Sequence, residues 1–148
     1  MNNLIDGKKV ASEIKNEITQ KISYSKSKGN RAPSIIIILV GDHGPSKIYV
    51  NAKLKACESV GIDAELISLN DNINQDQLSE IIKKLNLDQN LDGFIVQLPL
   101  PKHIDEQKVI MAIDPNKDVD GFHPVNVGRL TLDLPTFISA TPFGIMEL

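Results

Sequence analysis

The chain has a single cysteine and no long hydrophobic run. Cys57 alone cannot form an internal disulfide, which suits a reducing compartment and favours a cytoplasmic location. No apolar run approaches the length of a membrane span, and the first residues form no extended apolar segment, so we expect neither a membrane partner nor a targeting segment. The net charge of -3, without a block of Lys or Arg, gives no sign of a nucleic-acid partner.

Several motifs that carry chemistry are also absent. Neither G-x-G-x-x-G nor the P-loop pattern occurs, so the chain has no visible phosphate loop for a nucleotide cofactor. The three histidines, His43, His103 and His123, are far apart and lack the spacing of metal ligands, so we expect no metal site. The nucleophile elbow G-x-S-x-G is missing too.

The residues that are present alternate between helical and strand patterns within a length that fits one domain. Apolar residues every four positions, from Val10 to Ile22, predict an amphipathic helix over 10–26. The pattern further predicts strands over 35–40, 64–69 and 94–98, and helices from about Ser46 to Gly61, from the Asn74/Gln77 capping box to Leu85, and from Asp105 to Ile113. This alternation predicts an α/β fold, a three-layer α/β/α domain around a short, mainly parallel sheet.

The last residues of the sequence predict the start of one more helix. Thr141 and Pro142 are a favourable N-cap and first-turn pair, and Phe143, Ile145 and Met146 begin an apolar face. The sequence stops about two turns later, which is shorter than an isolated helix needs for stability. We therefore expect that a longer natural chain continues beyond this point.

Tyr49 and Lys53 are the most informative pair in the sequence. They lie four residues apart on a predicted helix, so both side chains leave the same face beside a core stripe that includes Cys57. A ligand at the carboxyl end of the strand over 35–40 would meet both the ring and the amine. Partial burial disfavours a charged amine, which would make Lys53 usable as a base, although a lysine that only extends its head into water has the same pattern.

Gln97 interrupts the apolar strand predicted over 94–98, close to its end, and Asp120 lies just past another probable strand end. A buried amide such as Gln97 needs polar partners, and either Lys53 or a loop backbone would serve. Asp114 and Asp118 are expected to be solvated or to cap turns. Asp120 lies between Val119 and Gly121, where the chain should turn inward, and a carboxylate there could bind a ring with two adjacent N–H donors.

Three segments at matching spacing resemble one enzyme family. They are Val40-Gly41 with Tyr49-Val50-x-x-Lys53 through Gly61, Asp92-Gly93-Phe94-Ile95-Val96-Gln97-Leu98-Pro99, and Pro115-x-Lys117-Asp118-Val119-Asp120-Gly121-Phe122-His123-Pro124. Together they resemble the bifunctional methylenetetrahydrofolate dehydrogenase/cyclohydrolase family. The chain departs from the family pattern at Gly44-Pro45-Ser46, which leaves the course of the 41–46 loop open, and at Ser139-Ala140, where the family often has Pro-Cys.

The resemblance implies a fold like the N-terminal domain of amino-acid dehydrogenases and an enzyme of one-carbon folate metabolism. Such an enzyme oxidises 5,10-methylenetetrahydrofolate with NADP and hydrolyses the methenyl product to 10-formyltetrahydrofolate. By this resemblance Lys53, Gln97 and Tyr49 are catalytic: Lys53 is the acid/base, Gln97 tunes it, and Tyr49 positions and stacks on the folate. The same three residues bind the substrate together with Asp120, which holds the pterin edge. The resemblance also implies a homodimer in the cytoplasm.

The same resemblance predicts how the chain divides. Residues 1–148 would be the tetrahydrofolate-binding catalytic domain, and about 136–148 would begin the connection to an NADP-binding Rossmann domain that this sequence does not contain. The chain alone would then be inactive as a dehydrogenase. Two alternatives stay open, a folate-binding module without turnover and an unrelated flavodoxin-like binding domain.

Overall fold

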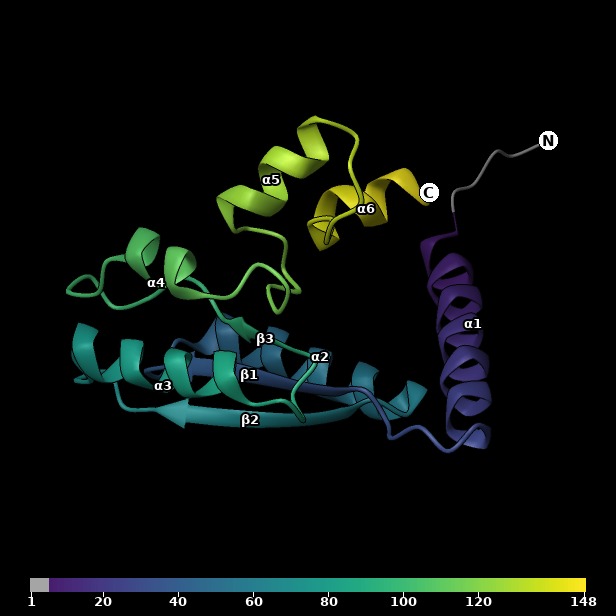
Figure 1. Ribbon diagram of the computed structural model, residues 1–148, viewed down its shortest axis with the longest axis horizontal. Coiled ribbons are helices and arrows are strands. Elements are labelled where there is room, and N and C mark those ends of the chain that lie inside the picture. Colours follow the sequence, from purple (N-terminus) through teal and green to yellow (C-terminus); the bar gives the residue numbers. More distant parts are fainter. Residues whose placement is uncertain (1–5) are drawn as a thin grey trace.

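The computed structural model describes residues 6–148, and within them three strands form one parallel sheet. The elements follow in the order α1 (Gly7–Ser27), β1 (Ser34–Val40), α2 (Gly44–Val60), β2 (Asp63–Leu69), α3 (Gln75–Leu87), β3 (Gly93–Val96), α4 (Glu106–Ala112), α5 (Pro124–Thr131) and α6 (Ala140–Met146). The strand order is β2-β1-β3, with both neighbours of β1 parallel to it (Figure 1). The expected α/β fold with a short parallel sheet is confirmed.

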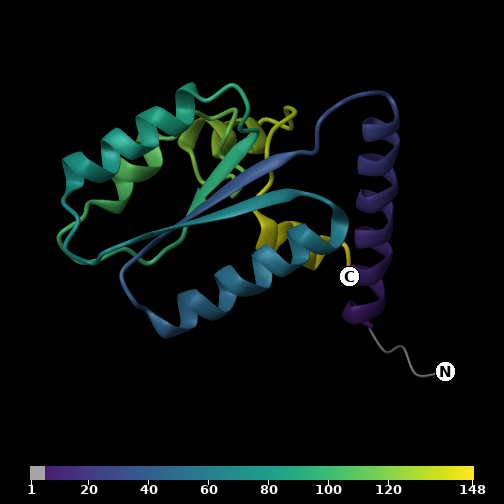
Figure 2. The same ribbon diagram turned by 90° about the horizontal axis from the view of Figure 1, so that it is seen from below.

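Helices cover both faces of the sheet, because β1 is apolar on both of its faces. Ile38 and Val40 belong to a core cluster that includes α3 and α4, while Ile37 and Leu39 pack with Val50 of α2 on the opposite side. Figure 2 shows α2 and α3 on opposite sides of the strands. A central strand that alternates between two cores produces the three-layer arrangement.

Most predicted boundaries agree with the structure to within one or two residues. The capping box of Asn74 and Gln77 is present at the start of α3, and Gly61 closes α2 with a left-handed φ of 86°. β3 ends at Val96, so Gln97 follows the strand instead of lying within it. The ladder still continues, since the Gln97 backbone N–H donates to the Ile38 carbonyl at 2.9 Å.

Two helices near the end of the chain differ from the sequence-based expectation. α5 was not predicted, and it begins at Pro124 with the His123 ring accepting from the Val125 N–H at 3.1 Å. The assignment of Thr141 as an N-cap is wrong, because Ser139 is the N-cap of α6. Pro142 is tolerated inside the first turn, where backbone N–H groups have no partner within the helix.

Helices α4, α5 and α6 lie beyond the β3 edge of the sheet, and α1 stands at one end of the sheet, in contact with α2 (Figure 1). In residues 6–148 no helix is both long and apolar enough to cross a membrane. The carboxyl ends of β1 and β3, together with the segments that follow β3, form the region in which the predicted site residues lie.

Candidate functional site

Helix α2 presents Tyr49 and Lys53 from one face, as their spacing predicts. Val50, one residue after Tyr49, is 1% exposed and anchors the helix on the sheet. Tyr49 is 65% exposed, while the Lys53 side chain is 35% exposed, at the margin between core and solvent. The anchored helix therefore holds an accessible aromatic ring one turn from a half-buried amine.

The loop before α2 has an ordered course despite its departure from the family pattern. His43 is the N-cap position, and Pro45 lies in the first turn, where a missing N–H costs nothing. Ser46 is 2% exposed, and its Oγ lies 2.9 Å from His43 Nδ1. This contact fixes the start of the helix that carries Tyr49 and Lys53.

Lys53 Nζ lies between the two other predicted site residues. It donates to Gln97 Oε1 at 3.2 Å and forms an ion pair with Asp120 Oδ1 at 3.7 Å. The Gln97 amide is oriented by its own donation to the Leu98 carbonyl at 2.8 Å. Since that bond uses the Nε2 donor, the Gln97 oxygen is left facing the amine.

A short extension of the sheet positions Asp120. Phe94 of β3 donates its backbone N–H to the Lys117 carbonyl at 2.9 Å, and Phe94 and Asp118 form an isolated parallel bridge. Gly121 follows with a φ of 68°, a conformation that favours glycine. The chain therefore turns directly after Asp120 and brings this carboxylate toward Lys53.

The Asp120 side chain is only 20% exposed. Burial raises the pKa of its carboxyl group above the ordinary value, because the charged form loses solvation. The Lys53 ammonium opposes this effect and the nearby Asp118 carboxylate adds to it. Burial therefore destabilises the charged form of Asp120, and hydrogen bonds from a ligand with N–H donors would stabilise it.

The four predicted site residues, Tyr49, Lys53, Gln97 and Asp120, line one cavity of about 360 Å³. Its remaining lining comes from Leu98, Phe122, Ser139, Ala140 and Thr141. Phe122 lies two residues after Asp120 in the sequence, and this proximity could have indicated that it lines the same cavity. The contribution of residues 139–141 depends on tertiary packing, and no local pattern indicated it.

Asp118 contradicts the expectation that it would be a solvated turn residue. It is 2% exposed, and its Oδ2 accepts from the His123 N–H and from Asn126 Nδ2, each at 2.8 Å. Asp114 behaves as expected, since it accepts from the Asn116 N–H within a turn at 2.8 Å. Sequence reasoning could not separate the two because both lie in the same stretch of turn-forming residues.

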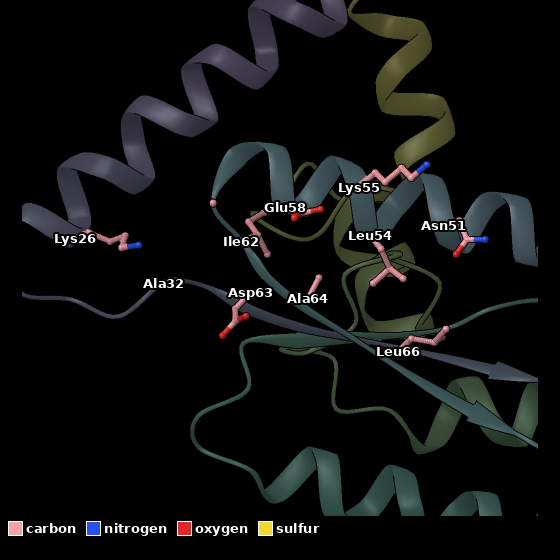
Figure 3. A pocket seen from close by; sticks show the side chains of 11 residues that line it. Lys26, Ala32, Asn51, Leu54, Lys55, Glu58, Ile62, Asp63, Ala64 and Leu66 are labelled. Carbon is pink, nitrogen blue, oxygen red and sulfur yellow. The ribbon is translucent and has the colours of Figure 1, made fainter.

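A larger cavity, of about 660 Å³, lies elsewhere, between α1, α2 and β2 (Figure 3). It is lined by charges of both signs, such as Lys26, Glu58 and Asp63, over the apolar Leu54 and Leu66. None of the predicted site residues lines it. We assign the site to the smaller cavity because polar groups converge there, whereas size alone indicates no chemistry.

Neither Cys57 nor a metal-binding cluster provides a second reactive centre in residues 6–148. Burial raises the pKa of the half-buried Cys57 thiol, which keeps it protonated and unreactive. Residues 6–148 contain no group of three or more His, Cys, Asp or Glu side chains placed to hold a metal ion. Among the residues that the structure describes, the loop before α2 does not fit a dinucleotide, because it carries Asp42 beside Lys47 and has no glycine-rich phosphate cradle.

Comparison with known proteins gives a consistent result. Residues 5–120 match the tetrahydrofolate dehydrogenase/cyclohydrolase catalytic domain. The bifunctional protein FolD of Flavobacterium johnsoniae is 56% identical over 98% of this chain and 49% of the relative, and that of Porphyromonas gingivalis is 54% identical over the same shares. The chain thus spans about half the length of the curated relatives that it matches.

Solved structures agree. A 5,10-methylenetetrahydrofolate dehydrogenase from the silkworm Bombyx mori matches with a TM-score of 0.96 at 48% identity, covering 99% of this chain and 51% of the other. A methylenetetrahydrofolate dehydrogenase-cyclohydrolase from Trypanosoma brucei, solved with NADP and an inhibitor, matches with a TM-score of 0.91 at 33% identity, covering 97% and 50%. From its sequence motifs, its fold and these matches, the chain belongs to the tetrahydrofolate dehydrogenase/cyclohydrolase family and corresponds to its catalytic domain.

Proposed function

We propose that this chain supplies the folate site and the catalytic lysine of a bifunctional enzyme. This enzyme oxidises 5,10-methylenetetrahydrofolate and hydrolyses 5,10-methenyltetrahydrofolate to 10-formyltetrahydrofolate. The observation that carries the proposal is the position of Lys53 Nζ, 3.2 Å from Gln97 Oε1 and 3.7 Å from Asp120 Oδ1, in a cavity bordered by Tyr49. A single amine between an amide acceptor and a carboxylate is suited to moving a proton at one point.

In the hydrolytic step, water attacks the methenyl carbon of the bound substrate. Lys53, acting in its neutral amine form, accepts a proton from this water as the new carbon–oxygen bond forms. The bond from that carbon to N5 then breaks, one of the two water protons ends on N5, and the other leaves to solvent. Gln97 holds the amine in place through its oxygen, and it is therefore a positioning partner of Lys53.

Tyr49 and Asp120 would bind the substrate. An accessible tyrosine ring on a rigid helix offers a stacking surface for a planar pterin. The pterin edge has adjacent N–H donors, and the Asp120 carboxylate can accept two of them in charge-assisted bonds. Such bonds would also offset the desolvation of Asp120, so the carboxylate gains more from a ligand than a solvated one would.

The dehydrogenase step needs NADP, which would accept a hydride from the methylene carbon. Because the residues of this chain do not fit a dinucleotide, we assign the NADP site to a part of the enzyme outside residues 1–148. We also propose that residues of about 136–148 lead into that part, that the whole enzyme is a cytoplasmic homodimer, and that this chain alone does not oxidise its substrate. The doubled length of the curated relatives supports a two-part enzyme.

The decisive test of the proposal is Lys53→Met. The methionine stem can still pack at the helix margin, so the fold should persist while methenyl hydrolysis falls by about 10²–10⁴-fold. Lys55→Met is the matched control, because Lys55 is an exposed lysine of the same helix outside the cavity. Hydrolysis is followed by the loss of methenyltetrahydrofolate absorbance, in 1–148 and in a full-length enzyme that contains it.

Near-normal hydrolysis by Lys53→Met would overturn the catalytic role of Lys53. If both 1–148 and the full-length enzyme bound a reduced folate but neither hydrolysed methenyltetrahydrofolate, the chain would be a folate-binding module and not part of an enzyme. Equal losses in both lysine variants would indicate a general effect of charge.

A further inference from the structure

One wall of the cavity comes from the stretch of chain that leads from α5 into α6. We call residues 136–141 the wall segment, because Ser139, Ala140 and Thr141 line the cavity. Within this segment Phe137 is 39% exposed and Ile138 is 41% exposed. Both side chains are only partly buried, so polar attachments add to apolar packing in holding the wall segment.

The first attachment is a hydrogen bond between side chains. Thr136 Oγ1 donates to Asn126 Oδ1 at 2.8 Å, and Asn126 is 2% exposed. The second is a close approach of backbones, since a Cβ atom at Gly121 would lie 2.8 Å from the Phe137 carbonyl oxygen. The wall segment is thus attached at its first residue and again beside the turn that follows Asp120.

Asn126 joins this wall to the segment that carries Asp120. Its Nδ2 donates to the Pro115 carbonyl at 2.9 Å and to Asp118 Oδ2 at 2.8 Å. With the Thr136 bond, one buried amide connects the wall segment to residues 115–118, which precede Asp120. Asn126 itself does not line the cavity, so any influence on a ligand passes through the groups that it holds.

We propose that Thr136, acting through Asn126, is a positioning residue that fixes the cavity wall against which the folate substrate binds. This inference rests on the proposed function. Removing the Thr136 hydroxyl leaves the Asn126 bonds to Asp118 and Pro115 in place, so Lys53, Gln97 and Asp120 keep their arrangement. The expected effect is on substrate affinity and not on the chemical step.

The test compares three variants of the chain. Thr136→Val keeps the shape but removes the hydroxyl, and Thr136→Ser restores it. Thr131→Val is the matched control, because the Thr131 hydroxyl donates only to the Val127 carbonyl of its own helix, outside the cavity. Affinity for 5-formyltetrahydrofolate, a stable reduced folate, is measured by calorimetry, and methenyl hydrolysis is measured at steady state.

We expect Thr136→Val to weaken folate binding about threefold to tenfold, the loss typical of one hydrogen bond. KM for methenyl hydrolysis should rise by a similar factor while kcat stays within about twofold, the signature of a lost binding contribution. Thr136→Ser should restore both values, and Thr131→Val should change neither. Amide exchange over the wall segment should also quicken in Thr136→Val alone.

Unchanged affinity and KM in Thr136→Val would overturn the inference while leaving the proposed function intact. An equal loss in Thr131→Val, or a fall in kcat without a change in KM, would also overturn it. Failure of the unaltered chain to bind a reduced folate would overturn the proposed function, and the inference with it.

Discussion

Asp120 combines two opposing requirements in one residue. Its carboxylate is in a largely buried position beside Lys53, and burial raises its pKa despite the nearby positive charge. A fold that only needed stability would place a neutral side chain there. A desolvated carboxylate at this position supports the proposal that Asp120 binds a ligand with hydrogen-bond donors.

Asp120→Asn should therefore weaken folate binding at least tenfold. An amide presents one donor where the pterin edge needs an acceptor, and charge-assisted bonds contribute about 1.5–3 kcal/mol. Calorimetric titration with a reduced folate measures the effect. Asp114→Asn removes the same charge from the same segment outside the cavity and should bind normally; equal weakening in both would point to net charge alone.

The same substitution should stabilise the chain without ligand. Since the folded-state pKa of Asp120 is raised, the folded chain binds more protons than the unfolded chain between the ordinary and the raised value. The free energy of unfolding contributed by Asp120 accordingly falls as the pH rises through that window. Denaturant unfolding should show Asp120→Asn to be more stable than the unaltered chain at pH ~7, and equally stable near pH ~3, below both pKa values.

Single residues were predictable where a local pattern determined their surroundings. Helical spacing placed Tyr49 beside Lys53, and a polar residue at a strand end marked Gln97. Asp118 was missed because its burial comes from Asn126 and the His123 backbone, which reach it through a turn and a helix that no local pattern specified. The sequence shows which residues are polar, but not which distant residue forms a hydrogen bond with each of them.

At the scale of elements, the packing of β3 against the segment before Asp120 is unusually close. A Cβ atom at Gly93 would lie 2.4 Å from Val119 Cγ1 and 3.0 Å from the Lys117 carbonyl oxygen. The absence of a side chain at this position lets the two stretches of backbone approach. The strand and the Asp120 segment are therefore coupled through one glycine.

Gly93→Ala should displace the Asp120 segment and lower both stability and folate affinity. Overpacking of this kind costs about 1–3 kcal/mol, because Val119 and the backbone must shift. Gly128→Ala is the matched control, since a Cβ atom there meets nothing within 4 Å in helix α5. The control should be stabilised by about 0.5–1 kcal/mol, as alanine suits a helix interior better. Thermal unfolding and calorimetry on both variants give the comparison, and a Gly93→Ala chain with unchanged folate affinity would show that the segment tolerates the shift.

The main elements followed from periodicity, whereas the helices after β3 did not. β1 and α3 were predictable because an apolar run and a capping box specify them locally. α5 is only eight residues long and contains Gly128, so its sequence is too short to be recognised as a helix, and its apolar side chains are mostly exposed. The start of α6 was misplaced because a proline suits several positions of a first turn equally well.

For the molecule as a whole, acid sensitivity should differ between the two ends of the sheet. At the end opposite the cavity, Arg31 forms a two-pronged ion pair with Asp92, whose carboxylate also accepts from the Ser34 N–H at 2.7 Å. The hydrogen bond from Arg31 is the main cause that lowers the pKa of Asp92. Both side chains are about half exposed, so solvent screens the pair.

Asp92→Asn should modestly lower the stability of the chain at neutral pH. Because the folded-state pKa of Asp92 is lowered, its contribution is complete above the ordinary carboxyl pKa and is lost as the pH falls through the lowered value. Unfolding curves at several pH values measure this, and a double-mutant cycle with Arg31→Gln isolates the pair. A stability gap that widens toward acid pH would contradict the assignment.

The chain by itself should show no NADP-dependent oxidation of methylenetetrahydrofolate. Its sequence contains no glycine loop of the kind that binds a dinucleotide, so we expect residues 1–148 to lack a binding site for the hydride acceptor. A steady-state assay of purified 1–148 with both compounds checks this. Reduction of NADP near the median rate of enzymes, ~10 s⁻¹, would reveal a cofactor site among these residues.

The exposed ring of Tyr49 has a practical consequence for following these experiments by fluorescence. The chain contains no tryptophan and two tyrosines, Tyr24 and Tyr49, so no indole is present to collect the excitation of a tyrosine. Tyr24 lies on α1 beneath the Lys28 ammonium, away from the cavity. In a Tyr24→Phe chain, the remaining tyrosine emission comes from Tyr49 alone. A ligand stacked on the Tyr49 ring would quench this emission directly.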